Sequence, residues 1–396
     1  MNEILSILKP YPFEKLNKLL KETSPKIKNK IDFSIGEPKH AIPKSIIKNI
    51  NNHVSLWSYY PKTKQSEELS FAILKWIKKR HKLSIEYKNI ISVNGTREGI
   101  FSLVQSIFNK NSKQKYVLCP SPLYQIYEGA TLLAGGTPYY YEIDKNKDTF
   151  IDNLLNSKKS ILSKTQIIFI NSPNNPTGKT LSLEEWRRLF QISDKYNIKL
   201  ISDECYSEIY FTNKKPIGIL QACKLLGKSL NNIVMLTSLS KRSNVPGLRS
   251  GFAAGDSELI KSFLLYRTYH GSAMSPFTQK ISKLLWEDEI HVNANRLAYK
   301  KKFNLSNKIL AKFFDQKIIP QASFYLWLPT FIDAEYFCKD LYATTNTLVL
   351  PGNYILRQNN KKKSLWTNYI RIALVDNIKN TEIGLKRLRE FYGTIL

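Results

Sequence analysis

A lysine, a serine and an arginine that could together act on a phosphorylated ligand lie in the segment SLSKRSNVPGLRSG, residues 238–251. The segment follows an apolar run, Ile233–Leu236, which predicts a buried strand ending just before Lys241. Open α/β sheets bind their ligands at the carboxyl ends of strands. A lysine shielded from water beside an arginine loses its proton more readily, and the neutral amine can form a Schiff base with an aldehyde such as pyridoxal phosphate. The Ser238 hydroxyl and the Arg249 guanidinium suit the phosphate of that ligand.

Two further strand ends strengthen this pattern, which matters because the chain has 60 lysines and arginines and most are expected to be surface charges. The run Ile167–Ile170 leads to Asn175, whose amide can donate to a phenolate oxygen. The run Lys199–Ser202 leads to Asp203, and a buried acid needs a partner such as a pyridinium nitrogen. Helix capping or a buried ion pair is the alternative for Asp203. Tyr206, three residues on, can bond the same phenolate.

Two glycine-containing segments could approach a ligand with their backbones. Gly95, Thr96 and Arg97 begin a helix directly after the predicted strand Ile90–Val93, so their free amides form an anion site, with plain helix capping as the alternative. Gly36, in SIGEP, allows close approach of a ligand to the main chain or forms a simple turn.

Two larger side chains extend the candidate site. Tyr124 follows a proline-rich turn and can cover a flat ring, although packing is the commoner use of such a tyrosine. Arg371 lies in the apolar strand YIRIAL, residues 369–374. A half-buried arginine generally has an anionic partner, which is either an acid of the protein or a ligand carboxylate.

The elements that position these residues alternate between strands and helices from about residue 89 onward. This alternation predicts a parallel sheet with crossover helices. At 396 residues the chain exceeds one average domain. We expect an α/β fold with an N-terminal arm that contributes to a small domain (1–45), a large domain with a mainly parallel sheet flanked by helices (46–289), and a smaller α+β domain (290–396).

Apolar spacing also predicts individual elements. Helices are expected at Glu14–Leu20, Ser66–Arg80, Leu183–Tyr196 and Asn293–Phe314, and further strands at Ile31–Ile35, Tyr116–Cys119, Gly251–Gly255, Ser323–Leu328 and Thr347–Leu350.

The formal net charge of +28 is compatible with a nucleic acid, a membrane surface or an anionic substrate. The basic residues are dispersed, with no like-charge run longer than a triplet, so we expect no specific nucleic-acid partner, although non-specific binding to polyanions at low salt is expected. The four cysteines have no metal-type spacing, which favours a reducing compartment and argues against a structural zinc site. The sequence shows no secretory leader and no apolar run of membrane-spanning length, so we expect a cytoplasmic protein.

Taken together, the motifs resemble the class I aminotransferases, which are pyridoxal-phosphate enzymes of fold type I. The strings that stand in that family's order and spacing are SIGEP, NGTRE, NNPTG, DECYSEIYF, SLSKRSNVPGLRSGF and RIALV. The strings that look more like the N-succinyldiaminopimelate aminotransferases of bacterial lysine biosynthesis are YPFEKL, SIGEPKH, CPSPLYQIYEGA, DECYSEIYF, SKRSNVPGLRSG, YRTYHGSAMSP and LPGNYILR.

This resemblance implies a pyridoxal-phosphate site in which Lys241, Asp203 and Tyr206 are catalytic. By this resemblance Lys241 would be the Schiff-base lysine, and Asp203 would pair with the pyridinium nitrogen. Asn175 and Tyr206 would contact the phenolic oxygen, and Tyr124 would lie on the ring face. The phosphate would be bound by the Gly95, Thr96 and Arg97 amides together with Ser238 and Arg249. Tyr60 matches a tyrosine that reaches the phosphate of the neighbouring subunit, which implies a homodimer with shared active sites.

The resemblance further implies a reaction between N-succinyl-LL-2,6-diaminopimelate and 2-oxoglutarate. Arg371, with Asn175 and the backbone at Gly36, would bind the substrate and hold its α-carboxylate. The far end of the succinylated substrate carries further carboxylates. Arg267 and His270, in YRTYHG, are the expected partners of those carboxylates.

The neighbours of the Gly36 turn, Lys39 and His40, are weaker candidates for the same anions. A surface or packing role is the alternative for each of the four side chains.

Three other functions remain open from the sequence. The first is a class I aminotransferase with an acetylornithine, aromatic or aspartate donor. The second is a non-catalytic regulator on this fold, which would need an N-terminal DNA-binding domain, whereas only about 30 residues precede SIGEP. The third is a basic nucleic-acid-binding protein, for which no cofactor colour is expected.

Overall fold

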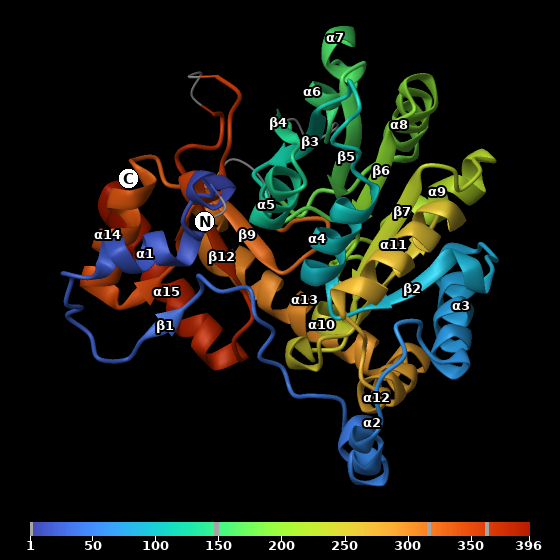
Figure 1. The fold of residues 1–396 in the computed structure, drawn as a ribbon. Coiled ribbons are helices and arrows are strands. Elements are labelled where there is room, and N and C mark those ends of the chain that lie inside the picture. Colours follow the sequence, from blue (N-terminus) through green and yellow to red (C-terminus); the bar gives the residue numbers. More distant parts are fainter. Residues whose placement is uncertain (1–2, 146–149, 315–317, 361–363) are drawn as a thin grey trace.

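The computed structural model describes residues 3–145, 150–314, 318–360 and 364–396. Figure 1 shows a twisted central sheet wrapped by helices, with a smaller group of strands and helices beside it. The central sheet contains β2 (Ile90–Val93), β3 (Tyr116–Ser121), β4 (Thr137–Glu142), β5 (Thr165–Asn171), β6 (Lys199–Asp203), β7 (Ile233–Ser238) and β8 (Gly251–Gly255). Their order is β2-β8-β7-β6-β5-β3-β4, and every neighbouring pair is parallel except the two pairs that involve β8. The mainly parallel α/β sheet predicted from the sequence is confirmed.

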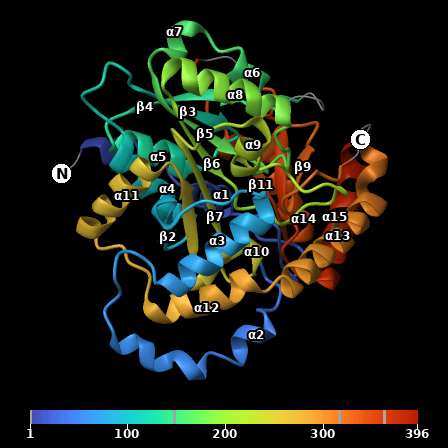
Figure 2. The same cartoon turned by 90° about the vertical axis from the view of Figure 1, so that its right-hand side faces the viewer.

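Both faces of the central sheet are buried because alternate residues of its strands enter two separate cores. Ile167 and Phe169 of β5 pack with one set of helices, and Ile168 and Ile170 pack with the other set. The first set is α4 (Thr96–Ile107), α5 (Gln125–Leu133) and α11 (Ser257–His270). The second set is α3 (Glu67–His81), α8 (Leu183–Tyr196), α9 (Ile219–Leu226) and α12 (Pro276–Glu287), of which α3 and α12 lie side by side in Figure 2.

The two ends of the chain share a third core. It contains β1 (Ile31–Asp32) paired with β10 (Thr347–Leu348), and an antiparallel sheet of β11 (Leu350–Pro351), β12 (Tyr369–Ala373) and β9 (Tyr325–Pro329). The helices around these strands are α1 (Pro12–Leu20), α13 (Ile290–Leu310), α14 (Ala334–Thr345) and α15 (Ile378–Ile395). In Figure 1 the blue α1 and β1 lie among the orange and red C-terminal elements. The domain limits at residues 45 and 289 stay a prediction.

The remaining described elements are short. They are α2 (Lys44–Ile47), α6 (Asp152–Leu155), α7 (Lys159–Leu162), α10 (Leu239–Arg242) and 3-10 helices at Glu3–Ile7, Asn51–Ser58, Tyr87–Asn89, Pro246–Leu248, Ala311–Phe313 and Gly352–Ile355. The α2 region projects from the rest of the chain in both views (Figures 1 and 2). Within the described ranges, no helix is long and apolar enough to cross a membrane.

Capping residues account for α8, whose observed bounds match the predicted ones. At the start of α8, the Ser182 side chain accepts from the Glu185 amide and the Glu185 carboxylate accepts from the Ser182 amide, which forms a capping box. Asn197 ends the helix with a φ of 52°. The predicted strand 347–350 is instead divided, because its first half pairs with β1 and its second half with β12.

Candidate active site

One cavity of about 230 Å³ collects most of the residues selected from the sequence. It lies where β5, β6 and β7 reach their carboxyl ends, and residues of β9, β12 and the chain before α1 close its other side. The selected residues that line it are Gly36, Thr96, Arg97, Tyr124, Asn175, Asp203, Tyr206, Lys241 and Arg371. Strands distant in sequence therefore deliver one cluster of functional side chains, as expected for this sheet edge.

Lys241 lies on α10, directly after β7, and its amine faces the cavity. Its Nζ donates to the Gly36 carbonyl at 2.6 Å, and it lies 5.3 Å from the ring centre of Phe324. Burial, to which the charge of Arg371 adds, lowers the pKa of Lys241 to about 8. A sizeable fraction of this amine is therefore neutral and nucleophilic near pH 8.

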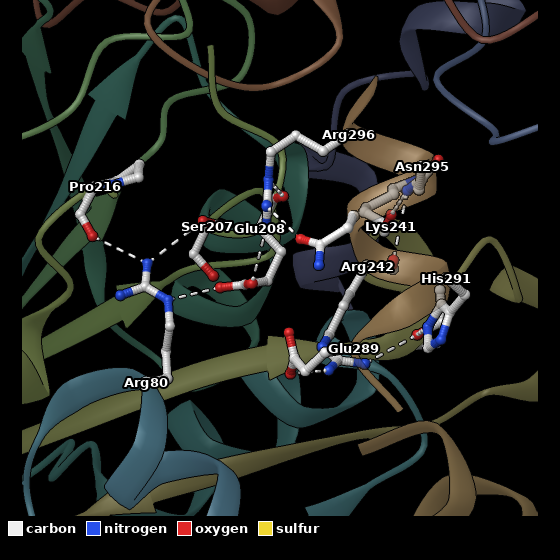
Figure 3. A network of polar contacts seen from close by, with 12 residues as sticks. Arg80, Ser207, Glu208, Pro216, Lys241, Arg242, Glu289, His291, Asn295 and Arg296 are labelled. Atoms are coloured by element: carbon white, nitrogen blue, oxygen red, sulfur yellow. Dashed lines mark hydrogen bonds and ion pairs between the residues drawn. The ribbon is translucent and has the colours of Figure 1, made fainter. Parts of the chain in front are cut away.

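The main chain of Lys241 is fixed from α13. Asn295 Nδ2 donates to the Lys241 carbonyl at 3.2 Å, as Figure 3 shows. Asn295 Oδ1 lies 2.7 Å from His40 Nδ1, and Lys302 Nζ lies 2.6 Å from His40 Nε2. Burial lowers the pKa of Lys302 to about 7. A buried polar chain therefore connects α13 and the SIGEPKH segment to the reactive lysine.

Arg242, the next residue, anchors the same turn on its other side (Figure 3). Its guanidinium pairs with Glu289 at 2.7 Å and donates to the Leu285 carbonyl at 2.6 Å. Its Cζ lies 5.0 Å from the ring centre of Trp286. The side chain of Arg242 is therefore used for support, which leaves Lys241 as the residue of this pair that enters the cavity.

Two arginines that share Glu208 fix the loop that follows Asp203 (Figure 3). Glu208 accepts from Arg80 of α3 at 2.6 Å, and Arg296 of α13 lies 3.5 Å from its other oxygen. Both Arg80 and Glu208 are buried. Removing one member of such a pair is costly, so the pair holds the loop and the Tyr206 side chain in place.

Asp203 ends β6 as a buried carboxylate with neutral donors. Tyr127 Oη donates to its Oδ2 at 2.8 Å, and the Cys205 amide donates to its Oδ1 at 3.2 Å. Burial raises the pKa of Asp203. No basic side chain of the described residues forms an ion pair with it. The carboxylate is therefore available to a cationic ring nitrogen.

Tyr127 was not selected from the sequence, although a signal for it exists. It lies three residues after Tyr124, so both project from the same turn at the start of α5. Its ring stacks on Phe169 of β5 with 4.5 Å between centroids. This stacking fixes the hydroxyl that bonds Asp203.

Arg371 enters the cavity from β12 with neutral partners. It donates to Asn175 Oδ1 at 3.2 Å and to the Ser34 carbonyl at 2.9 Å, and its buried Nε has no hydrogen-bond partner in the described ranges. Among the residues that the structure describes, no acid pairs with it, so of the two sequence-based alternatives a ligand carboxylate fits better than a protein acid.

Tyr325 of β9 is a further residue that sequence reasoning missed. Its Oη lies 3.2 Å from Tyr206 Oη, and its ring centre lies 4.6 Å from Arg371 Cζ. A Cβ on Gly36 would lie 1.9 Å from Tyr325 Oη, so only glycine fits at this position. Nothing local in the sequence indicates this contact, because Tyr206 and Tyr325 are 119 positions apart.

Gly95, Ser238 and Arg249 lie together beside the cavity at the start of α4. Gly95 has a φ of 84°, and a Cβ there would lie 2.2 Å from Arg249 Nη2. Arg249 donates to the Pro246 and Asn94 carbonyls. Cys205 Sγ, which was not selected, lies 3.7 Å from Ser238 Oγ and 3.0 Å from Thr96 Oγ1. Free amides, two hydroxyls and a cation thus surround a position suited to a phosphate.

The predicted cofactor, pyridoxal phosphate, fits these residues on three separate observations. Asp203 is a buried carboxylate that has no cationic partner among the residues that the structure describes. Lys241 is an amine with a lowered pKa. Gly95 has a φ of 84°, which favours glycine, and its backbone lies close to the Arg249 guanidinium at the start of α4.

Gly95, Ser238 and Arg249 lie beside the cavity, and three further selected residues lie away from it. Tyr60 is fully exposed, and His270 is exposed at the end of α11, with its ring stacked on Tyr266. Arg267 is fully buried, where it pairs with Glu98 and donates to the Ser272 carbonyl. Arg267 therefore does not line this cavity, and its charge is paired with Glu98.

The weaker candidates also lie away from the cavity lining. Lys39 pairs with Asp376 at 3.0 Å, and His40 belongs to the chain that ends at Lys302.

Comparison with known proteins gives consistent results. The family model described as "Aminotransferase class I and II" matches residues 28–388. The crystal structure of an aminotransferase from Neisseria meningitidis Z2491 is 42% identical, has a TM-score of 0.94 and covers 99% of this chain and 100% of its own. Aminotransferase AspB from Helicobacter pylori 26695 is 36% identical, with a TM-score of 0.89 and coverage of 97% and 99%. The LL-diaminopimelate aminotransferase of Natranaerobius thermophilus is 28% identical over 395 residues, or 98% of each chain.

Proposed function

We propose that this chain, which belongs to the class I and II aminotransferases, transfers an amino group between N-succinyl-LL-2,6-diaminopimelate and 2-oxoglutarate. It is a pyridoxal-phosphate-dependent enzyme whose substrates are an amino acid and a 2-oxo acid. The observation that carries the reaction is the convergence of Lys241, Asp203 and Arg371 on one cavity. The sequence strings given above support the succinylated donor, whereas the name of the Natranaerobius relative supports a diaminopimelate donor without the succinyl group.

In this proposal Lys241 holds the cofactor, Asp203 pairs with its ring nitrogen, and Asn175 and Tyr206 contact its phenolic oxygen. Tyr124 covers the ring, and the Gly95–Arg97 amides with Ser238 and Arg249 bind the phosphate. When bound, pyridoxal phosphate supplies an electron sink for the bond broken at the substrate α-carbon.

The protein's own residues supply the proton movement. Lys241 can accept the proton from the substrate α-carbon, because its pKa of about 8 keeps part of the amine neutral near neutral pH. The Gly36 carbonyl, 2.6 Å from Nζ, orients the amine. Tyr127 and the Cys205 amide hold the Asp203 carboxylate in one orientation.

Arg371 would orient the substrate by binding its α-carboxylate. Its guanidinium now donates to the neutral oxygens of Asn175 and Ser34, and a carboxylate forms stronger, charge-assisted bonds with the same fork. Gly36 adds a backbone contact at the same end.

The LL-diaminopimelate donor is the second candidate, because a relative of that name matches 98% of this chain. An initial-rate panel with 2-oxoglutarate separates the candidates. The proposal predicts that N-succinyl-LL-2,6-diaminopimelate has a higher kcat/KM than LL-diaminopimelate, acetylornithine, aspartate or phenylalanine. A tenfold preference for any other donor rejects the succinylated substrate and leaves the aminotransferase assignment intact.

We also propose a homodimer in which Tyr60 reaches the partner's phosphate site. Tyr60 is fully exposed and lies outside its own cavity, and Trp57 and Tyr59 of the same projecting region are also exposed. Mixing two impaired variants, Tyr60→Phe and Lys241→Ala, should restore part of the activity, because one hybrid site then carries both native residues. No recovery after demonstrated subunit exchange would reject this role. The cytoplasmic location stays a prediction.

A further inference from the structure

We propose that the Arg97 side chain binds the distal carboxylate of the substrate, so that the site selects amino and 2-oxo acids with a carboxylate at each end. This rests on the proposed function only in needing the aminotransferase cavity with Arg371 at its inner end. It does not need N-succinyl-LL-2,6-diaminopimelate to be the donor.

The Arg97 side chain is placed for this role, separately from its backbone amide. It leaves the first turn of α4, and its Nε donates to Tyr124 Oη at 2.9 Å. Its Nη2 donates to Tyr11 Oη at 2.8 Å. Arg97, Tyr11 and Tyr124 all line the cavity that contains Lys241.

No acid of the described residues neutralises the charge of Arg97. Its hydrogen-bond partners are two phenols, and within the described part of the chain no acid forms an ion pair with it. Burial raises the pKa of Tyr124, so its hydroxyl stays protonated at neutral pH. A hydroxyl that accepts from an arginine still has its own hydrogen to donate. One guanidinium and two phenolic donors therefore gather around a position suited to a carboxylate.

The cavity between the two arginines is partly apolar. Phe13, Leu123, Leu350 and Ile355 contribute to its lining. Such a wall suits the aliphatic middle of a substrate whose two ends are anionic. A substrate with an uncharged far end would leave Arg97 without an anionic partner.

The N-terminal arm supplies one of the two phenolic donors, Tyr11. Tyr11 directly precedes α1, which packs against α14 and β11. The Tyr11–Arg97 hydrogen bond therefore joins the N-terminal arm, which packs with the smaller group of strands and helices, to helix α4, which covers the central sheet. A purely structural latch is the competing role for Arg97, and substrate selectivity separates the two.

The matched donors for the first test are glutamate and glutamine, which differ in the distal carboxylate and its amide. Single-turnover kcat/KM is measured for the holoenzyme with each donor. We expect the wild type to prefer glutamate and Arg97→Gln to lower that preference by about tenfold, since a charge-assisted bond at a partly exposed site is worth roughly 1.5 kcal/mol. Arg187→Gln, which changes an exposed arginine on α8, is the control and should keep the wild-type ratio.

Equilibrium binding gives a second test that does not depend on turnover. Adipate and hexanoate differ by one terminal carboxylate, and calorimetric titration of the holoenzyme gives both Kd values. The proposal predicts tighter binding of adipate and loss of that difference in Arg97→Gln. It is overturned if adipate does not bind, if the wild type does not distinguish the two acids, or if the variant weakens both equally, as a latch would.

These tests are independent of the donor assignment. Failure of N-succinyl-LL-2,6-diaminopimelate in the donor panel together with an Arg97-dependent carboxylate preference would reject the proposed donor alone. Good turnover of that donor without an Arg97-dependent preference would reject the inference alone.

Discussion

The inner end of the cavity and its mouth are built from different kinds of element. At the inner end, Lys241 follows β7 and Asp203 ends β6, and each is fixed by hydrogen bonds. At the mouth, Arg97 and Tyr11 come from a helix start and the N-terminal arm, and Arg97 is exposed. The residues that carry out the chemistry need a fixed geometry, which the strand ends provide. The residues that determine selectivity lie on peripheral elements, which can change without disturbing the sheet.

Two buried arginines differ in the charge of their partners. Arg371 and Arg267 are both buried, but Arg371 has neutral partners and Arg267 has Glu98. The burial of an arginine therefore does not identify a ligand site. The charge of its partner distinguishes the two cases.

The largest effect is expected at the inner end, for Lys241→Ala. Loss of the amine removes the proton carrier, so kcat should fall on the order of 10⁴-fold while the cofactor can still bind noncovalently. Borohydride reduction of the wild type followed by peptide mapping should place the label on Lys241. A label on another lysine would contradict this assignment.

Asp203→Asn should lower kcat about 10²- to 10³-fold and change KM much less, because an amide cannot hold a ring-nitrogen proton and the loss is confined to the transition state. Tyr127→Phe keeps the carboxylate and removes one donor to it, so its loss of kcat should be smaller. Steady-state kinetics of both variants make the comparison. Equal effects on kcat and KM in Asp203→Asn would give Asp203 a structural role instead.

Removal of Arg267 should destabilise the protein more than removal of the Arg97 guanidinium. Arg267→Met leaves the partly buried Glu98 without its partner and should lower the free energy of unfolding by about 2–4 kcal/mol. Arg97→Gln breaks bonds to neutral phenols at an exposed site and should cost less than about 1 kcal/mol. Denaturant titrations of both variants measure this difference, and a larger loss for Arg97→Gln would reverse the comparison.

A pH-dependent effect is expected from the polar chain that supports Lys241 through Lys302. The folded-state pKa of Lys302 is about 7, below the unfolded value near 10.5, so the unfolded chain binds more protons between these pH values. The free energy of unfolding contributed by this group should therefore rise with pH in that window, by on the order of 1–2 kcal/mol.

Lys302→Met removes this proton-linked increment. Denaturant titrations of the two holoenzymes at pH 6.5 and pH 9 should show a smaller rise for the variant. Equal rises would show that Lys302 keeps its proton in the folded protein.

Much of the site could be predicted because its residues follow apolar runs. Periodic strands put Asn175, Asp203 and Lys241 at one sheet edge, and the observed bounds of β2 and β8 agree with prediction. Tyr325 could not be predicted, because its contact with Tyr206 joins β9 to the loop after β6. Arg267 was selected on type and spacing, and only packing reveals that Glu98 takes its charge.

The sequence by itself determined the alternation of strands and helices, since side-chain periodicity fixes which face of each element is buried. It also determined the order of the chemical groups along the chain. The tertiary structure alone decided the antiparallel direction of β8, the division of residues 347–350 between two sheets, and the partners of each charged side chain. Partners at long sequence separation depend on packing and desolvation in the folded state, and these are properties of no single segment.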